Sequence, residues 1–169
     1  MNLSENTNKT TTVNRGFSLI ELMIAVAVVA ILATIAIPSS LLHRQRSEVA
    51  EALRMASAIR EDVTDYYNNN LSFPSDNSEA GVPEPGLLIS NKVTSIEIED
   101  GAIHITLGNK VTKSLQAKIL TLRPAVVIDS PTSPISWLCG SDNPVPGMEA
   151  IGNNKTDLAI TLVPASCGS

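Results

Sequence analysis

The sequence predicts an α+β fold in which a long N-terminal helix packs on a small antiparallel β-sheet with a C-terminal disulfide loop. Residues 17–70 first form a continuous apolar run and then place apolar side chains at helical spacing. Residues 95–107 instead alternate apolar and polar side chains around an Asp-Gly turn. Two cysteines stand in the last third of the chain. With 169 residues in total, residues 71–169 are expected to form one small globular head.

The first 16 residues are expected to be a leader peptide that takes no part in the fold. They are polar, rich in Asn and Thr, and show no apolar periodicity. Lys9 and Arg15 precede the apolar run, and positive charge before a membrane span favours a cytoplasmic N-terminus. The mature chain would therefore begin near the start of the apolar run.

Residues 17–37 read FSLIELMIAVAVVAILATIAI and contain one charge, Glu21. A helix of this length reaches about 31 Å, close to the hydrocarbon core of about 30 Å, so we expect a transmembrane helix. A secretory signal is disfavoured because its apolar run is shorter and holds no carboxylate, and this hydrophobicity disfavours a core helix. A simple anchor stays open, although an unpaired acid inside a span costs on the order of a few kcal/mol.

The helix is expected to continue beyond Pro38, where a proline removes one backbone hydrogen bond and introduces a kink. Residues 38–70 are amphipathic, with Arg, Glu and Asp between apolar residues that recur at spacings of three, four or seven: Leu42, Val49, Leu53, Ala56, Ile59, Val63 and Tyr67. The Asn run at 68–70 and Pro74 predict the end of the helix near Asn68.

After a predicted loop at residues 72–92, the sequence SIEIEDGAIHITL predicts a hairpin around Asp100-Gly101. This register pairs Ile98 with Ile103 and Glu97 with His104. We expect the second pair to face solvent and not to form an acid/base pair, because no nucleophile stands nearby.

Further strands are expected near residues 117–123, ending at Pro124, and near residues 135–139, with an extra strand at residues 157–163. No cluster of His, Cys and carboxylates has metal-ligand spacing, so no metal site or cofactor is expected. A net charge of −5 gives no reason to expect tight nucleic-acid binding.

Cys139 and Cys167 suit one disulfide in an oxidising compartment better than a metal site that needs three or four ligands. Closing a loop of about 29 residues would stabilise the domain by about 3.5 kcal/mol. Two buried free thiols remain the alternative.

The string RGFSLIELMIAVAVVAIL, residues 15–32, resembles the processing and assembly motif of type IV pilin precursors. The resemblance implies that a membrane aspartyl prepilin peptidase cuts between Gly16 and Phe17 and N-methylates Phe17. It also implies that Glu21 pairs with the terminal amine of a neighbouring subunit. The family has a proline at the place of Pro38.

The later strings GAIHITLGNK, KILTLRP and ISWLCG, with a cysteine close to the C-terminus, resemble the head domain of major pilins. The resemblance therefore covers most of the mature chain. It implies that Cys139 and Cys167 form the bridge that closes a C-terminal surface loop.

The resemblance implies a structural role for a homopolymer of pilin subunits and no catalysis. Before assembly such a subunit is anchored in the bacterial inner membrane by a single span. An inner-membrane platform with cytoplasmic ATPases then assembles it into an extracellular pilus fibre. These fibres serve adhesion, twitching motility or DNA uptake, with host surfaces or DNA as further partners. The alternative is a minor pilin or a type II secretion pseudopilin, although the cysteine pair disfavours a major pseudopilin. An anchored enzyme would need a catalytic constellation in residues 72–169, and the sequence shows none.

Overall fold

The computed structural model of the chain describes residues 16–168, without the side chains of residues 35–39, 166 and 168. The predicted leader therefore lies outside the described residues, except for Gly16. The chain divides into two compact units with the boundary between Ser39 and Ser40. The first unit holds the beginning of the long helix, and the second holds the rest of that helix and the sheet.

Helix α1 runs from Leu19 to Asn70 and contains 52 residues. It begins where the backbone N–H groups of Glu21 and Leu22 both donate to the carbonyl of Ser18, at 3.1 Å each. It ends where the N–H of Leu71, at φ 53°, donates to the carbonyl of Tyr67 at 2.8 Å, a left-handed helix cap. The end therefore falls two residues beyond the predicted Asn68.

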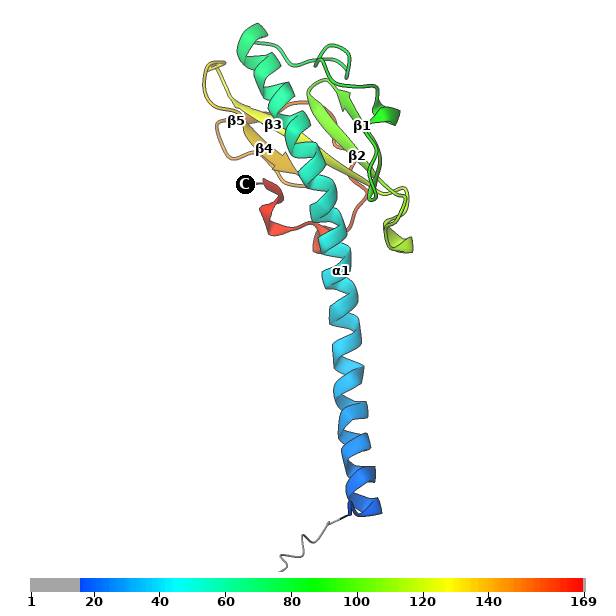
Figure 1. Cartoon of the computed structure of the whole chain (residues 1–169). Helices are drawn as coiled ribbons and strands as arrows, with labels where there is room; N and C mark the ends of the chain where they lie inside the picture. Colours follow the sequence, from blue (N-terminus) through cyan, green and yellow to red (C-terminus); the bar gives the residue numbers. More distant parts are fainter. Residues whose placement is uncertain (1–15, 169) are drawn as a thin grey trace, which may run out of the picture. The chain divides into compact units, whose positions relative to one another are not determined.

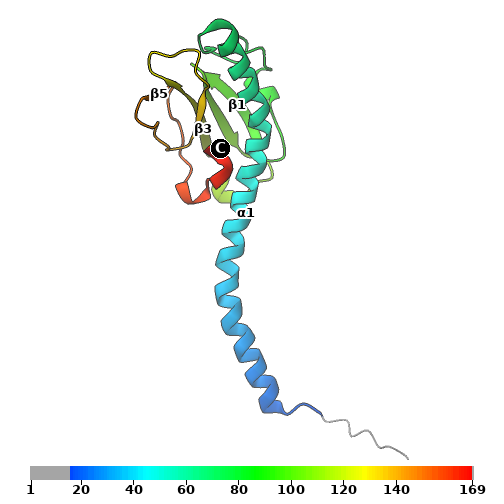
Figure 2. The ribbon, with the colours of Figure 1, turned by 90° about the vertical axis from the view of Figure 1, so that its left-hand side faces the viewer.

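In the second unit, residues 40–70 of α1 lie across one face of a five-stranded antiparallel sheet (Figures 1 and 2). The strands are β1 (Val93–Glu99), β2 (Ala102–Leu107), β3 (Ile119–Val127), β4 (Ser136–Cys139) and β5 (Met148–Ala150). Their order is β1-β2-β3-β4, and β5 also pairs with β3. The predicted α+β fold is confirmed.

The core lies between α1 and the sheet. Every second residue of the hairpin points toward the helix, and the helix contributes apolar residues spaced three or four apart. Together these side chains form one apolar layer. The buried members include Val49, Ala52, Ala56, Ile59 and Val63 from α1 and Ile96, Ile98, Ile103, Ile105 and Leu107 from the hairpin. Each buried Ile or Val contributes roughly 1.5–3 kcal/mol relative to an exposed one.

The predicted hairpin register is confirmed, with Ile98 opposite Ile103 and Glu97 opposite His104. Asp100 and Gly101 both have positive φ, at 48° and 81°, as this two-residue turn requires. A Cβ atom on Gly101 would also lie 2.7 Å from the Cβ of Phe73, so the position needs glycine for space as well as for conformation.

The prediction that His104 faces solvent is wrong. It is 2% exposed, and its Nδ1 lies 3.0 Å from Oγ1 of Thr121 on β3. The segment that follows β5 accounts for this burial, because the N–H of Lys155 donates to the same Thr121 oxygen and the Lys155 ammonium pairs with Glu99. Burial lowers the pKa of His104, and the positive charge of Lys155 lowers it further. Glu97, across the strand, is exposed as predicted.

Strand β3 does not end at Pro124 but continues through it to Val127. On one edge of β3, β2 pairs as far as Leu122 and β5 begins to pair at Ala125. Pro124 therefore stands between two ladders, where its missing N–H costs no strand hydrogen bond. The predicted strand at residues 157–163 is also wrong, since residues 160–162 form a 3-10 turn.

Asn77 completes the outer edge of β1. Its Oδ1 accepts from the N–H of Ile98 at 2.7 Å, and its Nδ2 donates to the carbonyls of Ile96 at 3.0 Å and Pro83 at 2.8 Å. The amide thus bonds β1 in the way the backbone of a parallel strand would. Because β1 is the terminal strand of the sheet, Asn77 also blocks an edge that could pair with another chain.

Candidate functional site

The N-terminal end of the described chain presents an accessible peptide bond. Gly16, Phe17 and Ser18 precede α1 and are not helical, and all three are exposed. Phe17 is 83% exposed, and nothing lies within 4 Å of the position a Cβ would take on Gly16. Exposed and irregular backbone of this kind is where proteases cleave. The predicted cut between Gly16 and Phe17 has no structural obstacle and stays a prediction.

Glu21 lies in the first turn of α1, at a recess that it lines together with Gly16, Phe17 and Ser18. An acidic residue in a first helical turn is stabilised by the free N–H groups there. Within residues 16–168, no cationic side chain pairs with its carboxylate. The residue therefore stands one turn from Phe17 with its charge available to a further partner.

The side chains that surround Glu21 along α1 are apolar and exposed. Their exposed fractions range from 50% to 83% for Phe17, Leu19, Ile20, Leu22, Met23, Ile24, Val26, Val28, Val29, Ile31 and Leu32. An apolar surface of this extent marks a contact with protein or lipid.

Among the described residues, no helix has the combined length and apolarity needed to cross a membrane.

The predicted span at residues 17–37 includes three positions, 35–37, whose side chains lie outside the description. Pro38 falls within the bounds of α1, and its side chain also lies outside the description. The span and the role of Pro38 in assembly stay predictions.

Cys139, at the end of β4, and Cys167, in the C-terminal 3-10 turn, form a disulfide. Their Cα atoms are 5.7 Å apart, and the two residues are 1% and 4% exposed. The predicted bridge is confirmed, and the alternative of two free thiols is wrong. The bridge holds the C-terminal segment to the sheet.

Glu48 is a buried carboxylate that was not predicted from the sequence. It is 4% exposed and accepts from the N–H of Thr112 at 2.8 Å, while Arg44 Nε lies 3.2 Å and Lys92 Nζ 3.5 Å away. Burial alone would raise the pKa of Glu48, but the hydrogen bonds from Thr112 and Arg44 and the charge of Lys92 together hold it below its ordinary value. Position 48 precedes Ala52 by one helical turn, and this phase was the signal for its burial.

No group of three or more His, Cys, Asp or Glu side chains within the described part of the chain is arranged to hold a metal ion. The charged groups near His104, which are Glu97, Glu99 and Lys155, pair with one another instead.

Comparison with known proteins finds a matching family model for the N-terminal part of the chain and another for the rest. Residues 12–37 match the model of the prokaryotic N-terminal methylation motif, and residues 45–168 match the model of Pilin, a bacterial filament. The type IV major pilin protein PilE1 of Neisseria gonorrhoeae is 34% identical over 164 residues, which are 92% of this chain and 88% of that protein. A fimbrial protein of Neisseria meningitidis serogroup A is 35% identical over 76% of this chain and 74% of its own length. The fimbrial protein EcpC of Eikenella corrodens is 35% identical over 77% of this chain and 84% of its own length.

Proposed function

The chain belongs to the type IV pilin family, and on this premise we propose that the exposed apolar part of α1 joins its copies into a surface fibre. Membership of the family makes the chain a structural subunit of a pilus, anchored in a membrane before assembly and part of the fibre afterwards. The observation that carries the proposal is the row of exposed apolar side chains from Phe17 to Leu32, which Glu21 alone interrupts with a charge.

Helix-to-helix packing would remove this apolar surface from water at roughly 25 cal/mol per Å². The same packing would leave Glu21 in apolar surroundings, where a carboxylate needs a positive partner. Cleavage after Gly16 supplies one, because it creates an amine on Phe17 at the end of the apolar helix. N-methylation keeps this amine basic, so the pairing of Glu21 with the amine of a neighbouring subunit survives the modification.

Before assembly the same apolar helix would anchor the subunit in the bacterial inner membrane, with its N-terminus in the cytoplasm. A prepilin peptidase would cut at Gly16, and an inner-membrane platform driven by cytoplasmic ATPases would extract the subunit into the extracellular fibre. Pro38 would give the helix a point of flexure next to the apolar segment during this step. Adhesion, twitching motility and DNA uptake are the roles that such a fibre would serve, without catalysis by the subunit.

Mass spectrometry of the intact protein from sheared surface fibres tests this proposal. The expected chain begins at N-methylated Phe17, lacks two hydrogens because of the Cys139–Cys167 bridge, and dominates the preparation. A full-length or differently cut chain found only in membranes would contradict the proposal. A correctly cut but scarce chain would identify a minor pilin or a type II secretion pseudopilin instead.

A further inference from the structure

One end of the second unit gathers three segments that are far apart in the sequence. Residues 40–47 begin this unit's part of α1, residues 109–116 contain the 3-10 turn η2 (Lys113–Leu115), and residues 159–163 contain the 3-10 turn η3 (Ile160–Leu162). Both turns lie beside the beginning of this part of α1 (Figures 1 and 2). We call the exposed side chains of these three segments the basal surface.

Hydrogen bonds and packing hold the two turns against α1. Gln45 Nε2 donates to Oγ of Ser114 at 2.7 Å, and Arg46 Nε donates to the carbonyl of Thr161 at 2.7 Å. Leu115 is fully buried in the core beneath the same end of the helix. The basal surface is therefore a fixed part of the folded head.

The basal surface is positively charged, although the whole chain carries a net charge of −5. Its three segments contain no Asp or Glu, and their Lys and Arg residues are Arg44, Arg46, Lys110 and Lys113. Among the described residues, the ammonium groups of Lys110 and Lys113 have no hydrogen-bond or ion-pair partner. Glu48, which borders the surface, is buried and already paired within the chain. The surface therefore carries positive charge that the head does not neutralise.

Apolar side chains lie among these charges. Leu41 is 51% exposed, and Ile160 is 62% exposed. Surfaces that combine Lys and Arg with exposed apolar side chains bind at the interface of anionic membranes, where the charges meet the headgroups and the apolar groups enter the acyl boundary. The composition of the basal surface therefore fits contact with an anionic lipid surface.

The place of the basal surface along α1 brings it close to a membrane. Arg44 follows Ile37, the last residue of the predicted span, by seven residues, which is about 10 Å of helix. A bend at Pro38 only shortens this distance. The headgroup layer beyond the hydrocarbon is roughly 5–8 Å thick. Arg44 would therefore lie within one Debye length, about 8 Å, of the headgroups.

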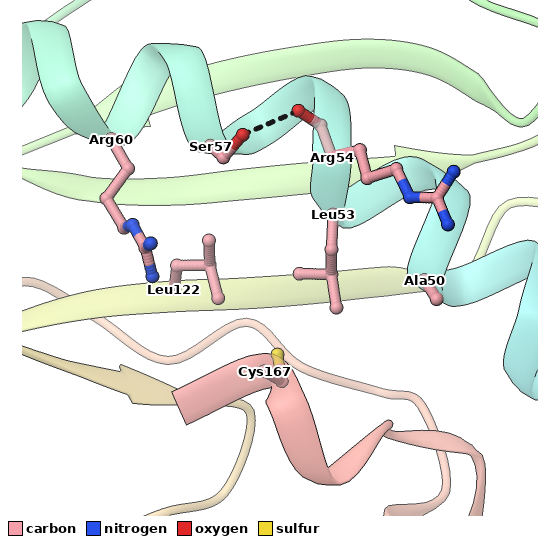
Figure 3. A pocket seen from close by; sticks show the side chains of 7 residues that line it. All are labelled: Ala50, Leu53, Arg54, Ser57, Arg60, Leu122 and Cys167. Carbon is pink, nitrogen blue, oxygen red and sulfur yellow. Dashed lines mark hydrogen bonds between the residues drawn. The ribbon is translucent and has the colours of Figure 1, made fainter. Parts of the chain in front are cut away.

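Two further arginines of α1, Arg54 and Arg60, lie outside the basal surface. They stand at the two ends of a cleft of about 250 Å³ beside Cys167 (Figure 3). Arg54 follows Arg44 by ten residues, which is about 15 Å of helix and about two Debye lengths in physiological salt. An anionic bilayer would therefore attract these two side chains much less, and they provide a control of the same charge.

We propose that the basal surface docks on the anionic headgroups of the membrane in which α1 is anchored before assembly. Lys110 and Lys113 contact the headgroups, while Leu41 and Ile160 enter the interface between them. The head is thereby held at the bilayer until assembly removes the subunit from it. The partner is a bilayer that contains anionic lipid, and the inference rests on the membrane anchor in the proposed function.

Reconstitution of the full-length chain in lipid nanodiscs tests this contact. One set of discs contains phosphatidylcholine alone, and the other contains equal parts of phosphatidylcholine and phosphatidylglycerol, which is anionic. The readout is hydrogen–deuterium exchange of the backbone amides in residues 109–116. Residues 61–70, at the other end of α1, serve as the internal reference.

Two double variants are compared with the wild type. Lys110→Gln with Lys113→Gln removes two charges from the basal surface without breaking an ion pair of the described chain. Arg54→Gln with Arg60→Gln is the matched control, because it removes two positive charges from the same head outside that surface. Unchanged melting temperatures show that both variants are folded.

We expect exchange in residues 109–116 of the wild type to be about tenfold slower in the anionic discs than in the neutral discs, because each Lys or Arg near an anionic surface favours the docked head. Salt at about 1 M should remove the difference, since the Debye length falls to about 3 Å. The lysine variant should lose most of the difference, and the arginine variant should keep it.

Equal exchange of the wild type in both kinds of disc would overturn the inference, and so would a lysine variant that responds to lipid as strongly as the arginine variant. If the wild type shows no dependence on lipid while the lysine variant forms few fibres in cells, the basal surface is a contact with another subunit and the inference is wrong. A wild-type chain that does not co-purify with the discs would instead overturn the proposed membrane anchor, and the inference with it.

Discussion

Each of the two parts of helix α1 carries a carboxylate, and the surroundings of these two carboxylates differ. In residues 17–34 the apolar side chains are exposed and Glu21 has no cationic partner among the described residues. In residues 40–70 one face is buried in the core and Glu48 has three partners from its own chain. The second region stabilises the single subunit, whereas the first leaves both its apolar surface and its charge to be satisfied by other molecules. Changes in the first region should therefore affect assembly, and changes in the second should affect folding.

The largest effect is expected from Glu21→Ala. Without the carboxylate, the amine of a neighbouring Phe17 would stay unpaired in apolar surroundings, at about 3–5 kcal/mol per contact. We expect fibre yield to fall more than about a hundredfold, since every 1.4 kcal/mol is a factor of ten. Cleaved chain should still accumulate in membranes, and the thermal unfolding of the detergent-extracted protein should not change. Normal fibre yield would show that Glu21 has no partner in the fibre.

Removal of the disulfide should act on the head instead. The double variant Cys139→Ser with Cys167→Ser loses the closed loop, and the free energy of unfolding should fall by about 3.5 kcal/mol. Denaturant titration of the detergent-extracted chain measures this value against the disulfide-bonded wild type, and the reduced wild type should match the variant. A loss below about 1 kcal/mol would mean that the core alone holds the C-terminal segment to the sheet.

Asn77→Ala removes the amide that completes the edge of β1 and leaves the N–H of Ile98 without a partner. We expect a loss of about 2 kcal/mol in the free energy of unfolding. Asn91→Ala is the control, because Asn91 is an exposed residue of the same loop. Asn77→Asp keeps the acceptor and should fall between the two. Equal stability of the Asn77 and Asn91 variants would contradict the role of the amide.

The smallest effect is expected from Glu48→Gln, which keeps an acceptor for Thr112 but removes the charge beside Lys92. The loss at neutral pH should be about 1 kcal/mol. Because the folded pKa of Glu48 lies below its unfolded value, its contribution is present above about pH 4.5 and is lost as the pH falls through the folded pKa. The melting temperature of the wild type should therefore fall more than that of the variant between about pH 5 and about pH 3. Glu51→Gln, at an exposed position, should keep the wild-type dependence of the melting temperature on pH.

The features that local pattern determines could be predicted from the sequence. The end of α1 follows from an Asn run and a proline, and the hairpin register follows from a two-residue turn and strict alternation. The disulfide could be predicted without knowledge of the fold, because two cysteines allow one pairing, although two free thiols remained the alternative until the structure was known.

The features set by distant segments could not be predicted. His104 alternates like a solvent-facing residue and is buried because Lys155 and its neighbours cross that face of the sheet. A proline such as Pro124 usually ends a strand. Here it falls between the part of β3 that pairs with β2 and the part that pairs with β5, so the strand continues through it. Strand β5 has three residues, which are too few for an alternation to be recognised. Within the candidate site, the helical phase of Glu48 indicates its burial, but its partners Lys92 and Thr112 lie far along the sequence and could not be predicted.

A cryo-electron microscopy map of the native fibre tests most directly whether α1 leaves its partners to other subunits. We expect the apolar parts of neighbouring helices to pack together and each Glu21 carboxylate to lie within about 4 Å of the Phe17 nitrogen of another subunit, the usual limit for an ion pair. Neighbouring helices without contact, or a Glu21 that faces water in the assembled fibre, would contradict this expectation.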